Sequence, residues 1–355
     1  MGAYVGIDLG TTYSAIAFLD ETGRPQIIDN PSKADGNNIT ASNIAAIGNE
    51  LVVGNRARAQ FQQGKTAFAR FKRDMGTSVT YQHNGKDITP TELSTLVLKD
   101  LKRIAELEVG EIEKAVVTIP ANFGNDQRDA TMEAAKKAGL SIDFIINEPT
   151  AAALFYAFDS GNELHGNYVI YDLGGGTFDV SVIRVQGQDI EILSTDGISK
   201  LGGDDFDKAV QNLVKTKYFE ITENNLENYE YTLIQAEQDK IALSTRRKCI
   251  AGGDSEVADG ANPISLTRQE FEQEISALLA QCEILSESVV LDAGLTVADI
   301  EDIILVGGST RMPSVRESIN RVFGKQPVSP ENVDEMVSLG AALYSAFKSD
   351  KSGLN

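Results

Sequence analysis

The predicted fold follows from the stretch Val5-Gly6-Ile7-Asp8-Leu9-Gly10-Thr11-Thr12-Tyr13-Ser14-Ala15-Ile16-Ala17, which is echoed in mid-chain by Val169-Ile170-Tyr171-Asp172-Leu173-Gly174-Gly175-Gly176-Thr177-Phe178-Asp179-Val180-Ser181. Each stretch is an apolar run, then Asp-Leu-Gly, then a turn of Gly and Thr, then alternating apolar residues. Alternation with a period of two is typical of strands. Each stretch therefore predicts a β-hairpin with Asp, Gly and Thr at its tip.

The similarity between the two halves continues beyond the hairpins. Buried-strand runs at 112–120 and 300–308 are each followed by a predicted helix, at 125–138 and 314–323. Small residues then recur at 151–155 and 340–344 and allow a helix to approach its neighbour closely. Four paired features in one order predict two homologous α/β lobes, at 1–165 and 166–348. Insertions are expected at 30–110 and 204–295, and a polar tail at 349–355.

The second insertion is predicted to be mostly helical. Apolar spacing typical of helices runs through Phe206–Phe219, Leu233–Leu243 and Phe271–Leu291.

Composition excludes several classes of partner. The chain carries 32 Lys and Arg against 52 Asp and Glu, a net charge of −20, which repels nucleic acids and anionic lipids. A small anionic ligand is still allowed, provided that backbone N–H groups, a few basic side chains or a divalent metal hold it. No apolar run approaches the roughly 18 residues of a membrane span. The two cysteines and the absence of a signal peptide favour the cytoplasm.

The two hairpin tips predict a polyphosphate site. Consecutive Gly and Thr residues let backbone N–H groups converge on an anion, and two such tips facing one another would hold a polyphosphate from both sides. Asp8 and Asp172 would then supply oxygen ligands to Mg²⁺, through water. A single hairpin of this kind is also compatible with an ordinary glycine turn. Two copies in the same register favour the polyphosphate site.

Other candidates lie at strand ends and helix starts. Gly307 and Gly308 end a buried strand, and Arg311 offers a guanidinium for stacking on a base. Gly202 and Gly203 precede a helix whose N-terminus suits a phosphate. Lys72 is a candidate for holding a phosphate or a nucleophilic water, and Glu148 for orienting a water or a hydrated metal. The alternative interpretation of Lys72 is a solvated surface lysine, and that of Glu148 is a charge favoured at a helix N-terminus.

Taken together, these strings resemble the nucleotide-binding domain of the seventy-kilodalton heat-shock chaperones, the DnaK-like family within the actin and hexokinase superfamily. The similarity runs from Val5 to about Phe347. Actins and sugar kinases share the two-hairpin plan but not this set of strings. The matching segments are Gly6–Thr12, Ile145–Ala153, Asp172–Asp179, Gly202–Asp207 and Val306–Pro313.

The resemblance implies an actin-like ATPase fold, α/β in class, with a mixed sheet flanked by helices in each lobe and inserted subdomains. It implies hydrolysis of ATP to ADP and phosphate with Mg²⁺, and K⁺ as a further cation. The implied catalytic residues are Asp8, Lys72, Glu148, Asp172 and Thr177. Asp8 and Asp172 would place Mg²⁺, Asp179 would bind the monovalent cation, and Pro120 and Arg128 match an interlobe relay. The implied nucleotide contacts are Gly10, Thr11, Thr12, Tyr13, Gly174, Gly175, Gly176, Thr177, Gly202, Gly203, Asp204, Glu237, Lys240, Ser244, Gly307, Gly308, Ser309, Arg311 and Asp334.

The chain departs from the family pattern at three positions. Ile241 follows Lys240 where the family has an arginine that stacks on adenine, so nucleotide affinity is expected to be weaker. Phe144 replaces an arginine that contacts the J-domain cochaperone, and Tyr13 replaces an asparagine. The family implies a J-domain cochaperone, an exchange factor and a C-terminal peptide-binding region, before which this sequence ends. We expect a monomer with no nucleic-acid or membrane partner.

Three alternatives to a chaperone ATPase domain remain open from the sequence. One is a regulator that senses ATP or ADP and hydrolyses little, as Ile241 and Phe144 suggest. The second is a small-molecule kinase of the same superfamily, and the third is a filament-forming relative of actin.

Overall fold

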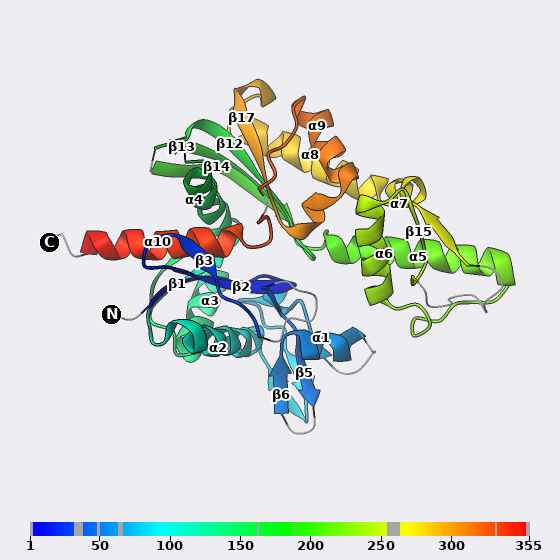
Figure 1. Cartoon of the computed structure of the whole chain (residues 1–355), viewed down its shortest axis with the longest axis horizontal. Coiled ribbons are helices and arrows are strands. Elements are labelled where there is room, and N and C mark those ends of the chain that lie inside the picture. Colours follow the sequence, from blue (N-terminus) through cyan, green and yellow to red (C-terminus); the bar gives the residue numbers. More distant parts are fainter. Residues whose placement is uncertain are drawn as a thin grey trace.

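Two mixed sheets lie one above the other in Figure 1, with helices α4 (Glu148–Ser160) and α10 (Met336–Ser352) between them. This computed structural model describes residues 3–31, 38–47, 50–62, 67–161, 163–187, 189–253, 263–330 and 332–352, with the backbone alone at 62, 143 and 347–352.

The first sheet has the strand order β11–β10–β1–β2–β3, and β4 also pairs with β2. Strands β1, β10 and β11 are parallel, whereas β2 runs antiparallel to β1 and β3. The predicted first hairpin is β1–β2, and Asp8 is the last residue of β1. The bounds are β1 Ala3–Asp8, β2 Tyr13–Leu19, β3 Pro25–Ile27, β4 Thr40–Ala41, β10 Ile112–Ile119 and β11 Ile142–Asn147.

The second sheet repeats this topology in the order β14–β13–β12–β17. Strand β17 is parallel to β12, as β10 is to β1, and β12–β13 is the predicted second hairpin. Val328 forms an isolated parallel bridge with Ile304, in the place that β11 takes in the first sheet. The predicted duplication is therefore confirmed in the strand order. The bounds are β12 His165–Leu173, β13 Phe178–Gln186, β14 Asp189–Ile198 and β17 Ile300–Val306.

Paired helices follow the paired strands. Helix α3 (Asn125–Lys137) follows β10, and α9 (Pro313–Phe323) follows β17, with Pro313 in its first turn. Small residues bring α10 very close to its neighbours, as predicted. A Cβ atom on Gly340 would lie 1.8 Å from the carbonyl oxygen of Ala151, and one on Gly6 would lie 2.0 Å from the amide nitrogen of Ala342. No side chain fits at either glycine without backbone movement.

Helix α10 connects the two halves of the molecule. It follows the second sheet along the chain but packs against β1 and α4. A hydrophobic core between the sheets includes Ala152, Ile170, Ile304 and Ala341, and each sheet has a further core of its own. Because α10 comes from the second half of the chain but packs on the first sheet, the division of the chain into two lobes at 165/166 stays a prediction. Residues 349–352 of the expected tail continue α10, and 353–355 lie outside the described residues.

The first insertion forms small strands and helices beside the first sheet (Figure 1). Its last helix, α2, places Leu93 and Val97 in the same core as Val5 and Ile7, so that α2 also supports the sheet. The bounds are β5 Ile44–Ile47, β6 Glu50–Val53, α1 Asn55–Gln62, β7 Ala67–Phe68, the 3₁₀ helix η1 Phe71–Asp74, β8 Tyr81–His83, β9 Lys86–Ile88 and α2 Pro90–Val109.

The second insertion is mostly helical, as predicted, with one difference. The apolar run Phe271–Leu291 is two helices instead of one, because the chain leaves helical geometry at Ile275 (φ −92°, ψ 0°). Helix α8 packs on β13 and β14, whereas α5 and α6 pack on each other. The bounds are α5 Gly203–Thr222, α6 Leu233–Thr245, β15 Lys248–Ile250, β16 Ser265–Thr267, α7 Arg268–Glu274 and α8 Ser276–Asp292; the 3₁₀ helices η2 Val297–Asp299 and η3 Gly308–Arg311 follow it.

Two further observations concern membrane spans and disulfides. Among the helices of the described ranges, none has both the length and the apolar character that crossing a bilayer requires. Cys249 and Cys282 are both free thiols, and Cys282 is buried.

Candidate functional site

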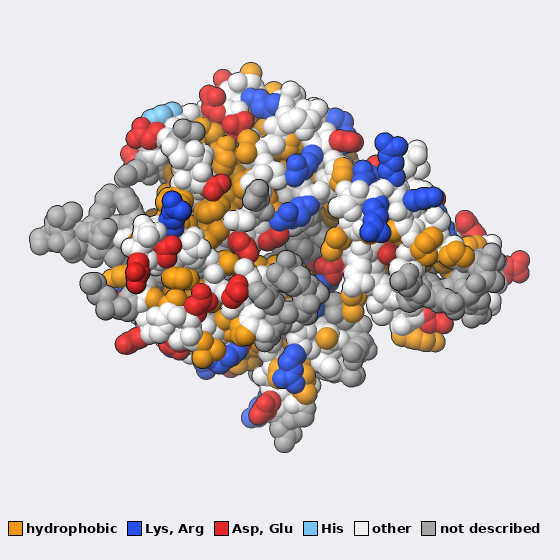
Figure 2. All heavy atoms as spheres, in the orientation of Figure 1, with side chains coloured by type: hydrophobic (Ala, Val, Ile, Leu, Met, Phe, Trp, Pro, Cys, Tyr) orange, Lys and Arg blue, Asp and Glu red, His pale blue; other side chains and the backbone are white. Residues whose placement is uncertain are grey.

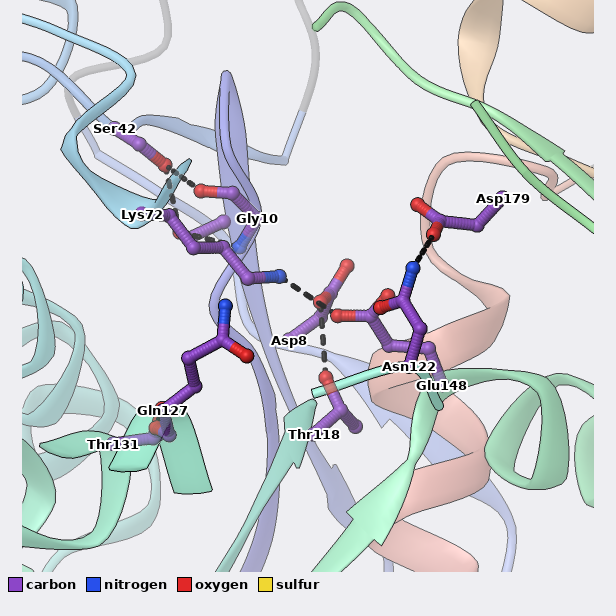
Figure 3. Close-up of polar contacts among 11 residues, drawn as sticks. Asp8, Gly10, Ser42, Lys72, Thr118, Asn122, Gln127, Thr131, Glu148 and Asp179 are labelled. Atoms are coloured by element: carbon purple, nitrogen blue, oxygen red, sulfur yellow. Dashed lines mark hydrogen bonds and ion pairs between the residues drawn. The ribbon is translucent and has the colours of Figure 1, made fainter. Parts of the chain in front are cut away.

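Four carboxylates and one lysine gather where the two hairpins meet. Asp8 ends β1, Asp172 lies near the end of β12, Asp179 follows the second turn, and Glu148 begins α4. The 3₁₀ turn η1 brings Lys72 to this group, where its Nζ lies 2.7 Å from Glu148 Oε1 (Figure 3). Lys72 and Glu148 are only 7% and 8% exposed, so this ion pair is almost fully removed from water.

The group holds four carboxylates and one lysine, and this excess of negative charge contributes to raised carboxylate pKa values. Burial and the charge of Glu148 raise the pKa of Asp8 to about 6, although Lys72 and the Thr118 hydroxyl oppose the shift. Burial also raises the pKa of Asp179 to about 7 and that of Asp172 well above its ordinary value. Burial lowers the pKa of Lys72, but Glu148 and Asp8 outweigh it and raise the value. A bound cation would relieve this excess of negative charge.

The donor set fits a hydrated magnesium ion. Within the described part of the chain, no group of three or more His, Cys, Asp or Glu residues converges closely enough to hold a metal directly. Mg²⁺ usually keeps several waters and needs only one or two carboxylates, and its assignment to Asp8 and Asp172 stays a prediction. Asn122 donates to Asp179 at 3.1 Å, and the Thr177 hydroxyl also bonds that carboxylate. The assignment of a monovalent cation to Asp179 stays a prediction.

The two Gly/Thr turns touch each other. A Cβ atom on Gly175 would lie 2.6 Å from Thr12 Oγ1, and one on Gly176 would lie 3.1 Å from Thr11 Cγ2. Thr12 Oγ1 is buried and has no hydrogen-bond partner among the described residues. A buried hydroxyl without a partner costs free energy, and a ligand oxygen between the turns would satisfy it.

The first turn is anchored by side-chain hydroxyls. Ser14 Oγ accepts from the amide of Gly10 at 3.1 Å, and Ser42 Oγ donates to the carbonyl of Gly10 at 2.8 Å. The ring of Tyr13, just after this turn, lies 5.0 Å from the Arg58 guanidinium.

The second turn is anchored mainly by the start of α5. The amides of Gly203 and Asp204 donate to the carbonyls of Gly174 and Gly175 at 3.0 and 2.6 Å, and Ser309 Oγ donates to the carbonyl of Gly174 at 2.9 Å. Gly307 (φ +84°) approaches so closely that a Cβ atom there would lie 2.5 Å from the Leu173 carbonyl oxygen. The segments predicted around Gly202 and Gly307 therefore both lie against the second turn.

The residues expected around adenosine lie on α6, in η3 and in the segment before α10. Lys240 Nζ lies 2.7 Å from Asp207 Oδ1 and donates to the Gly203 carbonyl at 3.2 Å. Glu237 pairs with Arg58 of α1, across the two insertions. The Ser244 hydroxyl bonds the carbonyl of Lys240 on its own helix. Arg311 lies 3.0 Å from Asp334, which also approaches Gly308.

The predicted relay residues lie beside the carboxylates. Pro120 lines a small pocket together with Glu148, Asp172 and Asp179. Arg128 donates to the Phe123 carbonyl at 3.1 Å and to Asn147 Oδ1 at 3.2 Å. Asn147 directly precedes Glu148 in the sequence. These contacts link the loop after β10 to the end of β11. A relay function for the two residues stays a prediction.

The structure adds polar residues that the sequence analysis missed. Thr118 donates to Asp8 Oδ1 at 3.0 Å, and the parallel register of β1 and β10 would have indicated that contact. Arg73 donates to the carbonyl of Gly176, and its position next to Lys72 was a usable signal. Arg58 and Glu237 are 179 residues apart in sequence, and no local pattern indicates their pairing.

The surface charge is uneven despite the strongly negative total. Most of the Lys and Arg side chains visible in Figure 2 lie over the second half, around α6, α7 and α9. This agrees with the expectation that a net charge of −20 does not forbid local binding of an anion.

Two lobes of one topology, with paired turns and carboxylates between them, define the actin-like ATPase class of fold. The chain belongs to the Hsp70 family, because the family model described as Hsp70 protein matches residues 4–353. The Chaperone protein DnaK of Mycoplasmopsis agalactiae is 39% identical over 352 residues, covering 96% of this chain. This chain spans 58% of the length of that relative. The resemblance drawn from the sequence and the predicted fold are both confirmed.

Proposed function

We propose that the chain binds ATP with Mg²⁺ between its lobes and hydrolyses it to ADP and phosphate, as the nucleotide-binding part of a DnaK-like chaperone. Nucleotide binding would close the lobes and product release would open them. The observation that carries the proposal is the meeting of two Gly/Thr turns beside buried carboxylates and the Lys72–Glu148 pair.

Phosphate binding is assigned to backbone amides and hydroxyls of the two turns. Thr11 and Thr12 would contact the phosphates from the first lobe, and the Gly174–Thr177 turn and Gly202–Gly203 from the second. This is supported by the buried Thr12 hydroxyl, which has no partner among the described residues. Asp8 and Asp172 would hold Mg²⁺ through its waters, and the ion supplies charge neutralisation of the phosphates when bound.

Hydrolysis is assigned to positioning of a water molecule, with no covalent intermediate. The Lys72 ammonium would hold and orient the attacking water, because Glu148 fixes it at 2.7 Å in a buried site. Glu148 and Thr177 would assist by orienting that water. Asp8 and Asp172 remain ionised when a cation offsets their mutual repulsion.

The proposal also includes the adenosine contacts, the cofactors and the partners that the family resemblance implies. Glu237, Lys240, Ser244, Arg311 and Asp334 would surround the adenosine, and Pro120 with Arg128 would transmit closure between the lobes. K⁺ at Asp179, a J-domain cochaperone, an exchange factor and a peptide-binding region belong to the same proposal.

Single-turnover release of phosphate tests this function. Lys72→Ala should lower the rate constant at least about 100-fold, while calorimetry still detects binding of ADP with Mg²⁺. Lys137→Ala, which removes a half-exposed lysine of α3, serves as the matched control. Unchanged turnover in Lys72→Ala would contradict the assignment, and a wild-type chain that binds no adenine nucleotide would contradict the whole function.

A second candidate is a nucleotide-sensing protein of the same family with little hydrolysis. It is favoured by Ile241, which is 58% exposed on α6, and by Phe144, which is 47% exposed. Calorimetric binding of ATP without single-turnover hydrolysis would select it. Membership of the Hsp70 family leaves the kinase and filament alternatives without a supporting observation.

A further inference from the structure

Arg70 combines a rare backbone conformation with an ion pair that crosses between the two halves of the molecule. It precedes η1 with φ 63° and ψ 14°, in the left-handed region that residues other than glycine seldom adopt. Its Nε lies 2.6 Å from Asp204 Oδ2, at the start of α5. The two side chains are 27% and 15% exposed, so the pair is largely shielded from water.

Arg70 and Arg73 both contact the second half of the molecule, Arg70 from just before the 3₁₀ turn and Arg73 from within it. The backbone of the turn links the two arginines, because the amide of Arg73 donates to the carbonyl of Arg70 at 3.1 Å. Arg73 bonds the carbonyl of Gly176 in the second turn. Lys72, between the two arginines, instead reaches Glu148 of the first half.

One turn therefore has contacts on both sides of the proposed nucleotide site. Two arginines attach it to the second lobe, at Asp204 and Gly176, and a lysine attaches it to the first. A left-handed backbone at a residue other than glycine persists only where its surroundings hold it. The Arg70–Asp204 pair, one residue before the turn, provides such a restraint.

We propose that Arg70 is a positioning residue that couples the Lys72 turn to the start of α5 and slows the release of nucleotide. The proposal rests on the function proposed above. Asp204 follows Gly202 and Gly203, and its amide holds the second turn at Gly175. The Arg70–Asp204 pair thus keeps η1 and the second turn at a fixed separation. Loss of the pair lets the start of α5 move away from Lys72.

Hydrogen exchange of the nucleotide-free protein tests the coupling directly. Arg70→Asn removes the guanidinium and keeps a residue that tolerates the left-handed region. It should increase amide exchange on both sides of the pair, at 71–74 and at 203–206, by about threefold or more. Arg70→Lys should restore most of the protection, because an ammonium group keeps the charge. Arg103→Asn, which removes an exposed arginine of α2, is the control.

Release of a fluorescent ADP into excess ATP provides the second readout. Arg70→Asn should speed release about three- to tenfold, and Arg70→Lys should remain within about twofold of the wild type. The double variant with Asp204→Asn should exchange no faster at 71–74 than Arg70→Asn alone, since one interaction is lost in both. The proposal fails if exchange rises only at 71–74 and release is unchanged, or if the lysine variant behaves like the asparagine variant. A wild-type protein that binds no ADP would instead refute the proposed function, and the exchange measurement would still test the coupling.

Discussion

Two buried lysine–carboxylate pairs, one in each half of the molecule, have nearly the same geometry and different surroundings. Lys72 lies 2.7 Å from Glu148, and Lys240 lies 2.7 Å from Asp207. The four side chains are between 8% and 10% exposed. Distance and burial therefore do not distinguish the pairs.

Their neighbours do distinguish them. The first pair lies beside Asp8 and Asp179, whose charges act on Lys72, so the group carries more negative than positive charge. The second pair joins α5 to α6, and Lys240 also donates to the carbonyl of Gly203. The charges of two further carboxylates act on Asp207, but each of them has an arginine partner: Glu237 with Arg58 and Asp204 with Arg70. A buried ion pair is weak support for stability by itself. The comparison teaches that carboxylates without a cation of their own in the described part of the chain mark the first pair for chemistry, whereas arginines offset the carboxylates around the second pair, which fits a supporting position.

The largest expected difference concerns the two acidic partners. Glu148→Gln should lower the single-turnover rate of ATP hydrolysis about 100-fold, because a neutral amide attracts the Lys72 ammonium less and is a weaker acceptor for a water. Asp207→Asn should change that rate constant by less than about threefold. Rapid-quench measurements at saturating ATP and Mg²⁺ compare the two variants. Equal losses of rate would remove the distinction between the pairs.

The pH dependence of stability should single out Asp207. Burial raises its pKa to about 7, and Lys240 opposes the shift only in part. Because this pKa lies above the ordinary value of 3.8, the stability contributed by Asp207 is full below about pH 4 and is lost as pH rises through about 7.

Urea unfolding of the nucleotide-free protein at about pH 5 and pH 8 measures this effect. Relative to Asp207→Asn, the wild type should lose about 1–3 kcal/mol of unfolding free energy between the two pH values. Asp292→Asn, at an exposed carboxylate, serves as the control. A difference independent of pH would show that the Asp207 carboxyl is ionised throughout this range.

A third variant tests whether the second pair lies beside the adenine. Ile241→Arg places a guanidinium next to Lys240, on an exposed position of α6 where the family resemblance implies stacking on adenine. The affinity for ADP should rise about fivefold, and the hydrolysis rate constant should stay unchanged. Calorimetric titration in the presence of Mg²⁺ checks the expectation. An unchanged or lower affinity would contradict the placement of adenine beside α6.

The smallest expected effect concerns the ring beside the first pair. The Lys72 ammonium lies 5.9 Å from the centre of the Phe123 ring. Phe123→Leu removes this cation–π contact and should slow hydrolysis about twofold, without changing ADP affinity. Arg128 bonds the backbone carbonyl of Phe123, which the substitution keeps. A tenfold or larger loss would mean that Phe123 has a further role in the site.

The sequence predicted the features that depend on local pattern. The two hairpins, the helices after β10 and β17 and the small-residue contacts of α10 all followed from alternation, spacing and paired order. Asp8 and Asp172 were predicted to lie together because they hold the same position in two hairpins expected to face one another, and Glu148 was a candidate because it lies between a strand and a helix.

Features that depend on distant packing escaped prediction. Neither the ion pair between Arg58 and Glu237 nor the left-handed backbone of Arg70 has a local signal, since each is stabilised by residues far along the chain. The break at Ile275 was missed because the apolar run continues through it. The packing of α10 on the first sheet was also missed. The order of elements along the chain does not indicate which sheet a helix covers.

A crystal structure with ADP and Mg²⁺ tests the central claim most directly. The account predicts that the diphosphate contacts both the Gly10–Tyr13 and the Gly174–Thr177 turns, with a hydrated ion within reach of Asp8 and Asp172. A nucleotide that touches only one turn, or an ion that leaves either aspartate beyond the reach of its waters, would contradict it.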